Sequence, residues 1–331
     1  MKRIPVVPVF LPVSLAVLLA APFVGGGIDP AAFFQPFSSS AGAMIFWKIR
    51  MPRALLGWIA GGGLAAAGMV FQAIFRNALA TPFTLGVSAG ASLGTALTLR
   101  LGLGAMILGF SGLNLGAIAG ALMAIALVYG LTRLRRSCTT ATMLLAGVAV
   151  NFLFSSLILL IQYSVDFYDT FRILRWMMGG LQMVGYNAPM QVLAVVLPVA
   201  VVLFLLSSEL NLLTLGEELA TSRGMAVART RTLLFFLVSI MVGVIVSICG
   251  PIGFVGLMCP HICRLLVGAD HRRLLPASIL FGGAFLVLCD TAARTLFGPT
   301  ELPVGIFTSL LGGPFFLCLL LKPGRGGEPA V

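Results

Sequence analysis

The stretch RALLGWIAGGGLAAAGMVFQAIF at residues 53–75 decides the fold class, because it is apolar throughout apart from the charge of Arg53 at its start. A helix needs about 20 predominantly apolar residues to cross the hydrocarbon core of a bilayer. Small residues recur every four positions at Gly57, Gly61 and Ala65, a spacing that lets helix backbones approach closely in lipid. The stretch therefore predicts a membrane-spanning helix that packs tightly against its neighbours.

Apolar runs of this kind recur along all 331 residues, without a linker or a soluble segment between them. Only 9% of the residues are charged and 59% are hydrophobic, against roughly 25% charged residues in a soluble domain. We therefore expect an all-α polytopic membrane protein with about ten transmembrane helices, folded as one domain over residues 1–331. The predicted spans lie near 4–24, 53–75, 83–99, 105–131, 140–162, 189–207, 229–250, 254–267, 274–297 and 303–321.

Two of these spans have alternatives. The first begins with basic residues and ends with small ones, as a cleaved signal peptide does, but further spans follow directly and we expect it to be retained. The segment 254–267 follows a Gly-Pro break and is short, so it is either a tilted span or a re-entrant piece. Five helices followed by five would also allow an inverted repeat.

The basic residues predict the orientation of the chain. The net charge of +11 comes from 21 basic and 10 acidic residues, and the basic ones stand between apolar runs, which indicates topology signals and not a nucleic-acid site. If 254–267 crosses the membrane, 14 basic residues fall on the side of the two termini and 7 on the other side. Both termini are therefore predicted in the cytoplasm. The seven on the far side are Lys48, Arg50, Arg53, Arg100, Arg172, Arg175 and Arg294.

The residue inventory argues against an enzyme. The three lysines stand outside any GxxxxGK[ST] sequence, so a phosphate-binding loop is excluded and any ATP must be bound by another subunit. Cys259, His261 and Cys263 resemble a soft-metal cluster, but residues two apart on a helix point roughly 200° apart. We predict no catalytic residue, no metal site and no cofactor on this chain.

Asp290 is the one acid clearly inside a predicted span. It precedes Arg294 by four residues, the favourable order for a helical ion pair, and we expect the two to neutralise each other. The alternative is an ion-coupled secondary transporter in which Asp290 carries a proton.

The segment LNLLTLGEELATSRGMAVART at residues 210–230 is too polar to span and contains glycines at Gly216 and Gly224. It predicts a short amphipathic helix on the side of the termini, docked against a partner, with a solvated loop as the alternative. The glycines at 86, 90 and 94 and at 112, 116 and 120 predict close packing within the chain. A dimer interface or a pathway wall are the alternatives for these glycines.

Six stretches of the sequence carry longer motifs. They are RMPRALLGWIAGGGLAAAGMVFQAIFRNALATPFTLGVSAGAS at 50–92, TMLLAGVAVN at 142–151, RWMMGG at 175–180, LGEELATSRGM at 215–225, GPIGFVGLMCPHICRLLVGADHRRLLPAS at 250–278 and ELPVGIFTSLLGGPFF at 301–316. These stretches resemble the FecCD family, the permeases of ATP-driven (ABC) importers for ferric siderophores, haem and vitamin B12. The resemblance covers roughly residues 50–331.

The resemblance implies a fold like that of the vitamin B12 importer permease, with ten helices per subunit and two permease subunits around one pore, for which we expect a homodimer. It also implies two copies of a cytoplasmic ATPase, which bind ATP and Mg, and a periplasmic or lipid-anchored substrate-binding protein. The membrane would be the inner (plasma) membrane. The cargo would be an iron chelate (a ferric siderophore or haem) or cobalamin.

The resemblance also assigns residues. The coupling segment 214–226 would contact the ATPase through Gly216, Glu217, Glu218, Ala220 and Gly224. The binding protein would dock on Arg50, Arg53 and Arg294, whose guanidinium groups suit carboxylates. The cytoplasmic gate would include Thr140 and Ala141. His261, in the family's Pro-His motif, would have a structural role at the start of a short helix, with its ring bonded locally.

Overall fold

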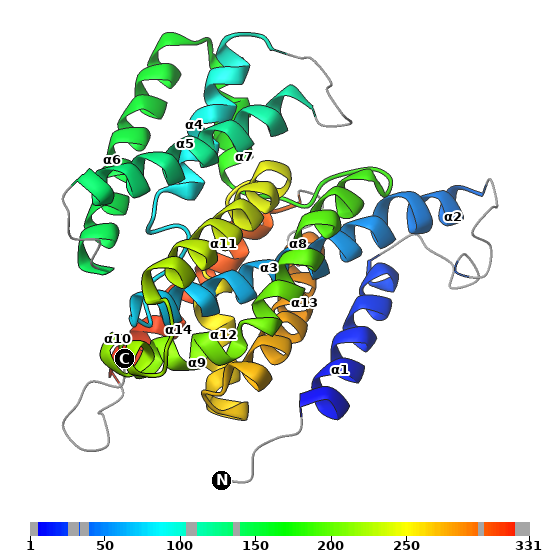
Figure 1. The fold of residues 1–331 in the computed structure, drawn as a ribbon. Helices are drawn as coiled ribbons and strands as arrows, with labels where there is room; N and C mark the ends of the chain where they lie inside the picture. The colour runs from blue at the N-terminus through cyan, green and yellow to red at the C-terminus, as the bar shows by residue number, and fades with distance from the viewer. Residues whose placement is uncertain are drawn as a thin grey trace.

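The structure is a computed structural model that describes residues 6–25, 33, 40–103, 111–134, 140–296 and 301–321 (Figure 1). All regular elements in these residues are helical. They are α1 (Val6–Ala20), η1 (Ala21–Phe23), α2 (Ala41–Ile45), η3 (Phe46–Arg50), α3 (Met51–Phe75), α4 (Val87–Arg100), α5 (Gly112–Leu134), α6 (Thr140–Ser164), α7 (Phe167–Met177), α8 (Asn187–Leu205), α9 (Ser207–Leu215), α10 (Glu217–Ser222), α11 (Val227–Cys249), α12 (Val255–Val267), α13 (His271–Thr295) and α14 (Val304–Leu321).

Each of the ten predicted spans coincides with one helix of 13 or more residues, which confirms the all-α polytopic fold. These helices are α1, α3, α4, α5, α6, α8, α11, α12, α13 and α14. Within the described residues, 6 helices are long and apolar enough to cross a membrane by length and composition alone. Shorter apolar helices lie at Pro8–Phe23, Val255–Val267 and Val304–Leu319.

The second span begins much earlier than the sequence predicts. α2, the π-helical turn η3 and α3 form one continuous helix of 35 residues, Ala41–Phe75. At 1.5 Å per residue it is about 52 Å long, well beyond the roughly 30 Å of the hydrocarbon core. Its first turns project from the bundle (Figure 1). Arg50 and Arg53 therefore lie where the helix leaves the bundle.

α3 is the central helix and packs on α8, α11, α12 and α13. Its glycines are needed at these contacts, because a Cβ on Gly61 would overlap the carbonyl oxygen of Gly282 in α13, and a Cβ on Gly68 would overlap that of Gly256 in α12. α4 and α5 meet in the same way, through Gly90, Gly94, Gly116 and Gly120. These contacts confirm that the small-residue spacings serve packing within the chain.

Helices α4 to α7 form one group, which packs on the remaining helices mainly through α11 (Figure 1). α7 was not predicted, because it is amphipathic and too short to span. The signal in the sequence that could have predicted α7 is the helix-capping residue Asp166. Its side chain accepts a hydrogen bond from the Asp169 backbone N–H at 2.9 Å. Ile173 supplies the buried face of this helix.

The break before α12 is supported by hydrogen bonds from another segment. Gly250 and Phe254 both have positive φ, at 66° and 65°. The carbonyl of Cys249, freed by the break, accepts a hydrogen bond from the Gly180 N–H at 2.7 Å, so an irregular turn is tolerated at this depth.

α12 ends near α9, because Asn211 Nδ2 donates to Asp270 Oδ1 at 2.9 Å. The chain therefore returns to the end of the bundle from which α11 starts, which favours a span over a re-entrant piece. The start of α1 and the end of α14 also lie at this end (Figure 1). We call it the α10 end, and we call the opposite end the Arg53 end. The side of the membrane that each end faces and the inverted repeat remain predictions.

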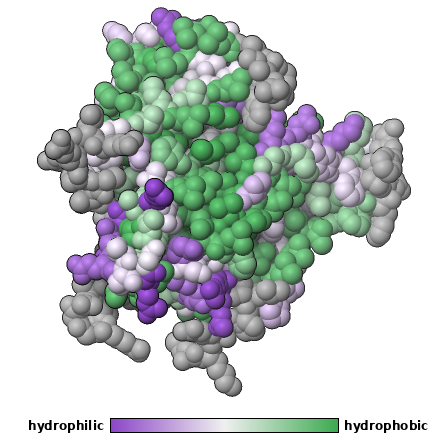
Figure 2. All heavy atoms as spheres, in the orientation of Figure 1, coloured by the Kyte–Doolittle hydropathy of each residue, from purple (hydrophilic) through white to green (hydrophobic). Residues whose placement is uncertain are grey.

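The surface agrees with a membrane-embedded bundle. Figure 2 shows hydrophobic atoms over most of the middle of the visible face, with hydrophilic atoms gathered toward the α10 end and beside the projecting helix. Large side chains such as Leu145, Phe152 and Leu159 on α6 are more than half exposed. In water such a surface would aggregate, whereas in a bilayer it matches the solvent.

Candidate functional site

The predicted coupling segment folds as α9 and α10, separated by Gly216. Gly216 has φ 125° and Gly224 has φ 81°, so both sharp turns use a backbone region that favours glycine. This confirms a short helix between the two glycines. α10 is held from beneath because Glu217 forms an ion pair with Arg231 of α11, and Ala220 is fully buried.

The outward face of α10 is formed by Glu218, Leu219, Ser222 and Arg223, all exposed. A partner at this end would contact these side chains directly. Glu217 and Ala220, which the resemblance assigns to coupling, instead fix the helix to the bundle. Leu219 and Arg223 were missed, although their spacing of four residues puts them on one helical face.

At the Arg53 end, one guanidinium is shared by two carboxylates. Arg53 Nε and Nη2 donate to Asp290 Oδ2 and Oδ1 at 2.8 and 2.9 Å, and Nη1 donates to Glu301 Oε2 at 2.8 Å. The Arg53 and Asp290 side chains are 9% and 7% exposed, whereas Glu301 is 40% exposed. The expected pairing of Asp290 with Arg294 is thus wrong, because both carboxylate oxygens of Asp290 accept hydrogen bonds from Arg53 of α3.

Two polar residues extend this network toward the surface. Gln182 Nε2 donates to Glu301 Oε2 at 3.4 Å, and Arg175 Nη2 donates to Gln182 Oε1 at 3.1 Å. Burial raises the pKa of the Glu301 carboxyl, but the hydrogen bond and charge of Arg53, with Gln182 and Arg294, outweigh it and leave the pKa lowered. Glu301 is therefore ionised at neutral pH and is the accessible acid of the network.

The other two arginines predicted for docking hold the end of α1. Arg50 Nη1 donates to the carbonyl oxygens of Pro22 and Gly25 at 3.2 Å each, and Arg294 Nη2 donates to that of Ala21 at 3.2 Å. All three predicted arginines and Glu301 line one cavity of about 390 Å³. The structure thus brings Arg50, Arg53 and Arg294 together, as the sequence predicted, but it places Arg53 in a buried ion pair.

Two further cavities lie between α7 and the start of α14. One, of about 430 Å³, reaches from Arg53, Arg175 and Glu301 to Met178. The other, of about 570 Å³, begins at Met178 and is bordered by Phe83 and Leu310. Charges line only the cavity nearer the Arg53 end, and the second is apolar apart from Ser309 and backbone groups. Glu301 and Gln182 were missed as network members because their partners are far away in sequence.

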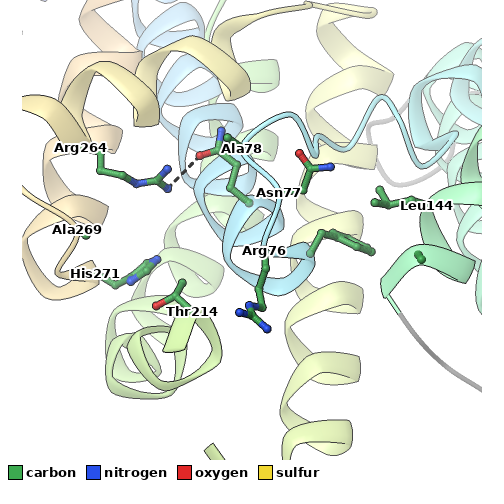
Figure 3. Close-up of a pocket in the computed structure, with 11 residues that line it drawn as sticks. Arg76, Asn77, Ala78, Leu144, Thr214, Arg264, Ala269 and His271 are labelled. Carbon is green, nitrogen blue, oxygen red and sulfur yellow. Dashed lines mark hydrogen bonds between the residues drawn. The ribbon is translucent and has the colours of Figure 1, made fainter. Parts of the chain in front are cut away.

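The predicted gate lies at the start of α6, at the α10 end. Ala141 is exposed and lines a cavity of about 680 Å³, together with Leu144 (Figure 3). Thr140 begins α6, and its side chain lies outside the described residues. The gate assignment itself remains a prediction.

The Cys-His motif lies in the middle of α12 and not at its start, which corrects that expectation. Cys259 and Cys263 are fully buried. The His261 ring packs edge-on against Phe315, with ring centroids 6.2 Å apart, and the expected local hydrogen bond is not found among the described residues. In the part of the chain that the structure describes, no three His, Cys, Asp or Glu residues are grouped to hold a metal ion.

Comparison with known proteins agrees with this architecture. Residues 12–322 match the FecCD transport family. The ABC transporter permease protein YvrB of Bacillus subtilis is 40% identical over 90% of this chain and 88% of its own length. The vitamin B12 import system permease protein BtuC of Salmonella typhi is 42% identical over 87% and 86%.

The hemin transport system permease protein HmuU of Yersinia pestis is 38% identical over 84% of this chain and 83% of its own length. A solved structure, described as an inward-facing conformation of an ABC transporter of the metal-chelate type, superimposes with a TM-score of 0.83. It is 32% identical and covers 96% of this chain and 99% of its own. The similarity therefore extends over nearly the whole bundle and is not confined to single motifs.

Proposed function

Because the chain belongs to the FecCD transport family and is therefore the membrane permease of an ABC importer, we propose that it carries a metal chelate into the cytoplasm. The cargo class is that of ferric siderophores, haem and cobalamin, the last two of which appear in the names of its relatives. The observation that carries the proposal is the match over residues 12–322, which contains the coupling segment, the arginine cluster and the gate.

The energy source is a pair of ATPase subunits below the α10 end, which bind ATP and Mg. The chain's three lysines stand outside any phosphate-binding loop, so this subunit performs no ATP chemistry. α10 offers an anchored helix with an exposed outer face, and the ion pair between Glu217 and Arg231 links that helix to α11. A movement of the ATPase at α10 would therefore pass directly to a membrane-spanning helix.

A substrate-binding protein, periplasmic or lipid-anchored, docks at the Arg53 end through acidic side chains. Arg50 and Arg294 line the open cavity there, and Glu301 is the carboxylate that already occupies Arg53. A carboxylate of the binding protein that binds Arg53 would therefore have to compete with Glu301. In this arrangement the α10 end and both termini face the cytoplasm, and the bundle lies in the inner membrane.

The functional unit is a homodimer around one pathway. α6 and α14 carry exposed apolar side chains, such as Phe152, Leu159 and Leu310, and α6 is mostly exposed within one chain. A second copy of the chain would cover part of this surface and would put two sets of the cavities at Met178 around a common axis.

The ion-coupled alternative has no feature of the structure in its favour. Asp290 accepts hydrogen bonds from Arg53 at both of its carboxylate oxygens, and the pair is buried. A proton carrier must instead exchange its proton during transport.

Uptake into proteoliposomes tests the proposal. The permease is reconstituted with its ATPase and supplied with binding protein loaded with a ferric siderophore, haem or cobalamin. ATP-dependent uptake of one chelate is expected, and it should be lost with Arg50→Glu/Arg294→Glu but retained with Arg100→Glu, an exposed arginine outside the cluster. Uptake by the permease alone along an ion gradient would contradict the proposal.

A further inference from the structure

We propose that the cavity of about 680 Å³ at the α10 end is a binding site for an acidic side chain of the partner ATPase, distinct from the coupling surface of α10. This inference rests on the proposed function. The cavity is formed by the end of α3, the start of α6, the end of α9 and the turn between α12 and α13 (Figure 3).

Arg264 gives this cavity a positive charge that forms no ion pair with an acid among the described residues. Its side chain is only partly exposed, and its Nη2 donates to Gln72 Oε1 at 3.1 Å, an uncharged amide. Gln72 is held in turn, because its Nε2 donates to the Leu257 carbonyl oxygen at 3.3 Å. A guanidinium carries five N–H donors, and its strongest partners are carboxylates or phosphates. A partly buried arginine that has only an amide partner can therefore bind an anion.

Arg76 provides a second guanidinium on the same cavity. Its backbone is left-handed, with φ 48°, and it ends α3 by this conformation. A non-glycine residue with such a φ costs energy and needs support from its surroundings. Its Nη1 lies 3.9 Å from the position that a Cβ on Gly216 would have, so the exposed guanidinium lies beside the start of α10.

The residues that line this cavity include no acid among those that the structure describes. The ion pairs formed by the described residues include neither Arg76 nor Arg264. Among the described acids at this end, Asp270 accepts hydrogen bonds from Asn211 Nδ2 and the Arg272 N–H, and Glu217 binds Arg231. We therefore infer that the complementary negative charge comes from another molecule.

The walls of the cavity are rigid enough for a specific site. His271 Nδ1 donates to Asn211 Oδ1 at 2.7 Å, and the same oxygen accepts a hydrogen bond from the His271 backbone N–H at 2.9 Å. These bonds fix the corner between α9 and α13. The volume lies within the range of about 300 to 1,000 Å³ that is typical of ligand pockets, and it admits a side chain together with part of its loop.

The position of the cavity favours the ATPase as the source of the acid. Thr214 of α9 lines it, and Gly216, which starts α10, adjoins Arg76, so the cavity continues the surface on which the ATPase is proposed to dock. Ala141, the gate candidate, also lines the cavity. An acidic side chain inserted into the cavity would therefore lie near both the coupling helix and the gate candidate.

Zero-length cross-linking tests this inference directly. In the permease–ATPase complex, Arg76→Lys places an amine at the cavity, and a carbodiimide would join that amine to a carboxylate in contact with it. The chain has only three lysines of its own, so the background is low. Mass spectrometry should identify one Asp or Glu of the ATPase linked to position 76, and no link from Arg100→Lys, the control. An intact complex without a link to the ATPase would overturn the inference.

Affinity measurements separate this inference from the proposed function. Arg264→Gln should weaken the binding of the ATPase to the permease at least about tenfold. Arg264→Lys should retain most of the affinity, and Arg273→Gln, an exposed arginine of the same end outside the cavity, should not change it. Leu219→Asp on α10 should abolish binding if the proposed function is correct.

Three further outcomes distinguish failure of this inference from failure of the proposed function. If Leu219→Asp abolishes binding while Arg264→Gln and Arg76→Gln leave it unchanged, the proposed function stands and the inference is wrong. If native mass spectrometry finds an anionic phospholipid that is lost in Arg264→Gln, and no ATPase cross-link forms, the cavity is a lipid site and the inference is also wrong. If Leu219→Asp has no effect, the proposed function itself fails.

Discussion

The two ends of the bundle handle their charges in opposite ways. At the Arg53 end, the buried guanidinium is paired with Asp290 and Glu301 of the same chain. At the α10 end, Arg76 and Arg264 line an open cavity that contains no acid among the described residues. Buried charges are stable only when they are paired. Arg53 therefore has its partners within one chain, whereas we propose that Arg264 receives its partner from the ATPase.

The largest expected effect comes from breaking the buried ion pair at the Arg53 end. Arg53→Met leaves the Asp290 carboxylate buried without a partner, which should cost about 3 to 5 kcal/mol of stability. Thermal unfolding of the detergent-solubilised permease measures this loss. The double variant Arg53→Met/Asp290→Leu should recover much of it. Simple additivity of the two single changes would show that the pair is not a unit.

The next effect is a gain in affinity for the substrate-binding protein, a result that a misfolded variant would not give. Glu301→Gln removes the carboxylate that competes for Arg53 Nη1, so the affinity for the substrate-binding protein should rise about fivefold, the equivalent of about 1 kcal/mol. Surface plasmon resonance with the permease–ATPase complex measures it. Glu218→Gln, at the other end, serves as the control and should leave this affinity unchanged. An equal or lower affinity with Glu301→Gln would mean that the binding protein does not use Arg53.

A smaller loss of stability is expected when Arg264 at the α10 end is replaced in the isolated permease. Among the described residues, Arg264→Met breaks a single hydrogen bond, to Gln72, and no ion pair, so it should change stability by about 1 kcal/mol or less. The same thermal unfolding assay compares it with Arg53→Met. A loss as large as that of Arg53→Met would reveal a structural ion pair at Arg264 and would remove the contrast between the two ends.

The smallest effect is a pH dependence of the stability that Glu301 contributes at the Arg53 end. The pKa of Glu301 is lowered in the folded protein, mainly because Arg53 outweighs the effect of burial. The stability that it contributes is therefore complete above the ordinary carboxyl range, and it is lost as the pH falls through the lowered pKa. Wild type should lose more stability than Glu301→Gln between neutral pH and about pH 4. Parallel pH profiles would contradict this assignment.

Most of the fold could be predicted from the sequence because each span is an independent apolar run. Residues 53–75 and 140–162, for example, are apolar enough by themselves to require a membrane. α7 and the projecting start of the Ala41–Phe75 helix were missed, because neither gives an apolar run. The hydropathy criterion detects contact with lipid and not helix formation.

The sites were less predictable because they join distant segments. The four-residue spacing favoured Arg294 as the partner of Asp290, whereas the actual partner, Arg53, is 237 residues away in sequence. The cluster of Arg50, Arg53 and Arg294 was inferred from family resemblance, and packing of α1, α3 and α13 brings it together. Arg264 and Arg76 stand 188 positions apart by their numbers, and only the packing of α12 on α3 puts them on one cavity.

We propose that the two ends bind different partners and that the bundle connects them. ATP hydrolysis by the permease–ATPase complex tests this in lipid nanodiscs, where both ends are accessible, with loaded binding protein added. Loaded binding protein should stimulate hydrolysis in wild type, and both Arg50→Glu/Arg294→Glu and Leu219→Asp should abolish this stimulation. Stimulation that persists in both variants, or an ATPase that never associates with the permease, would contradict it.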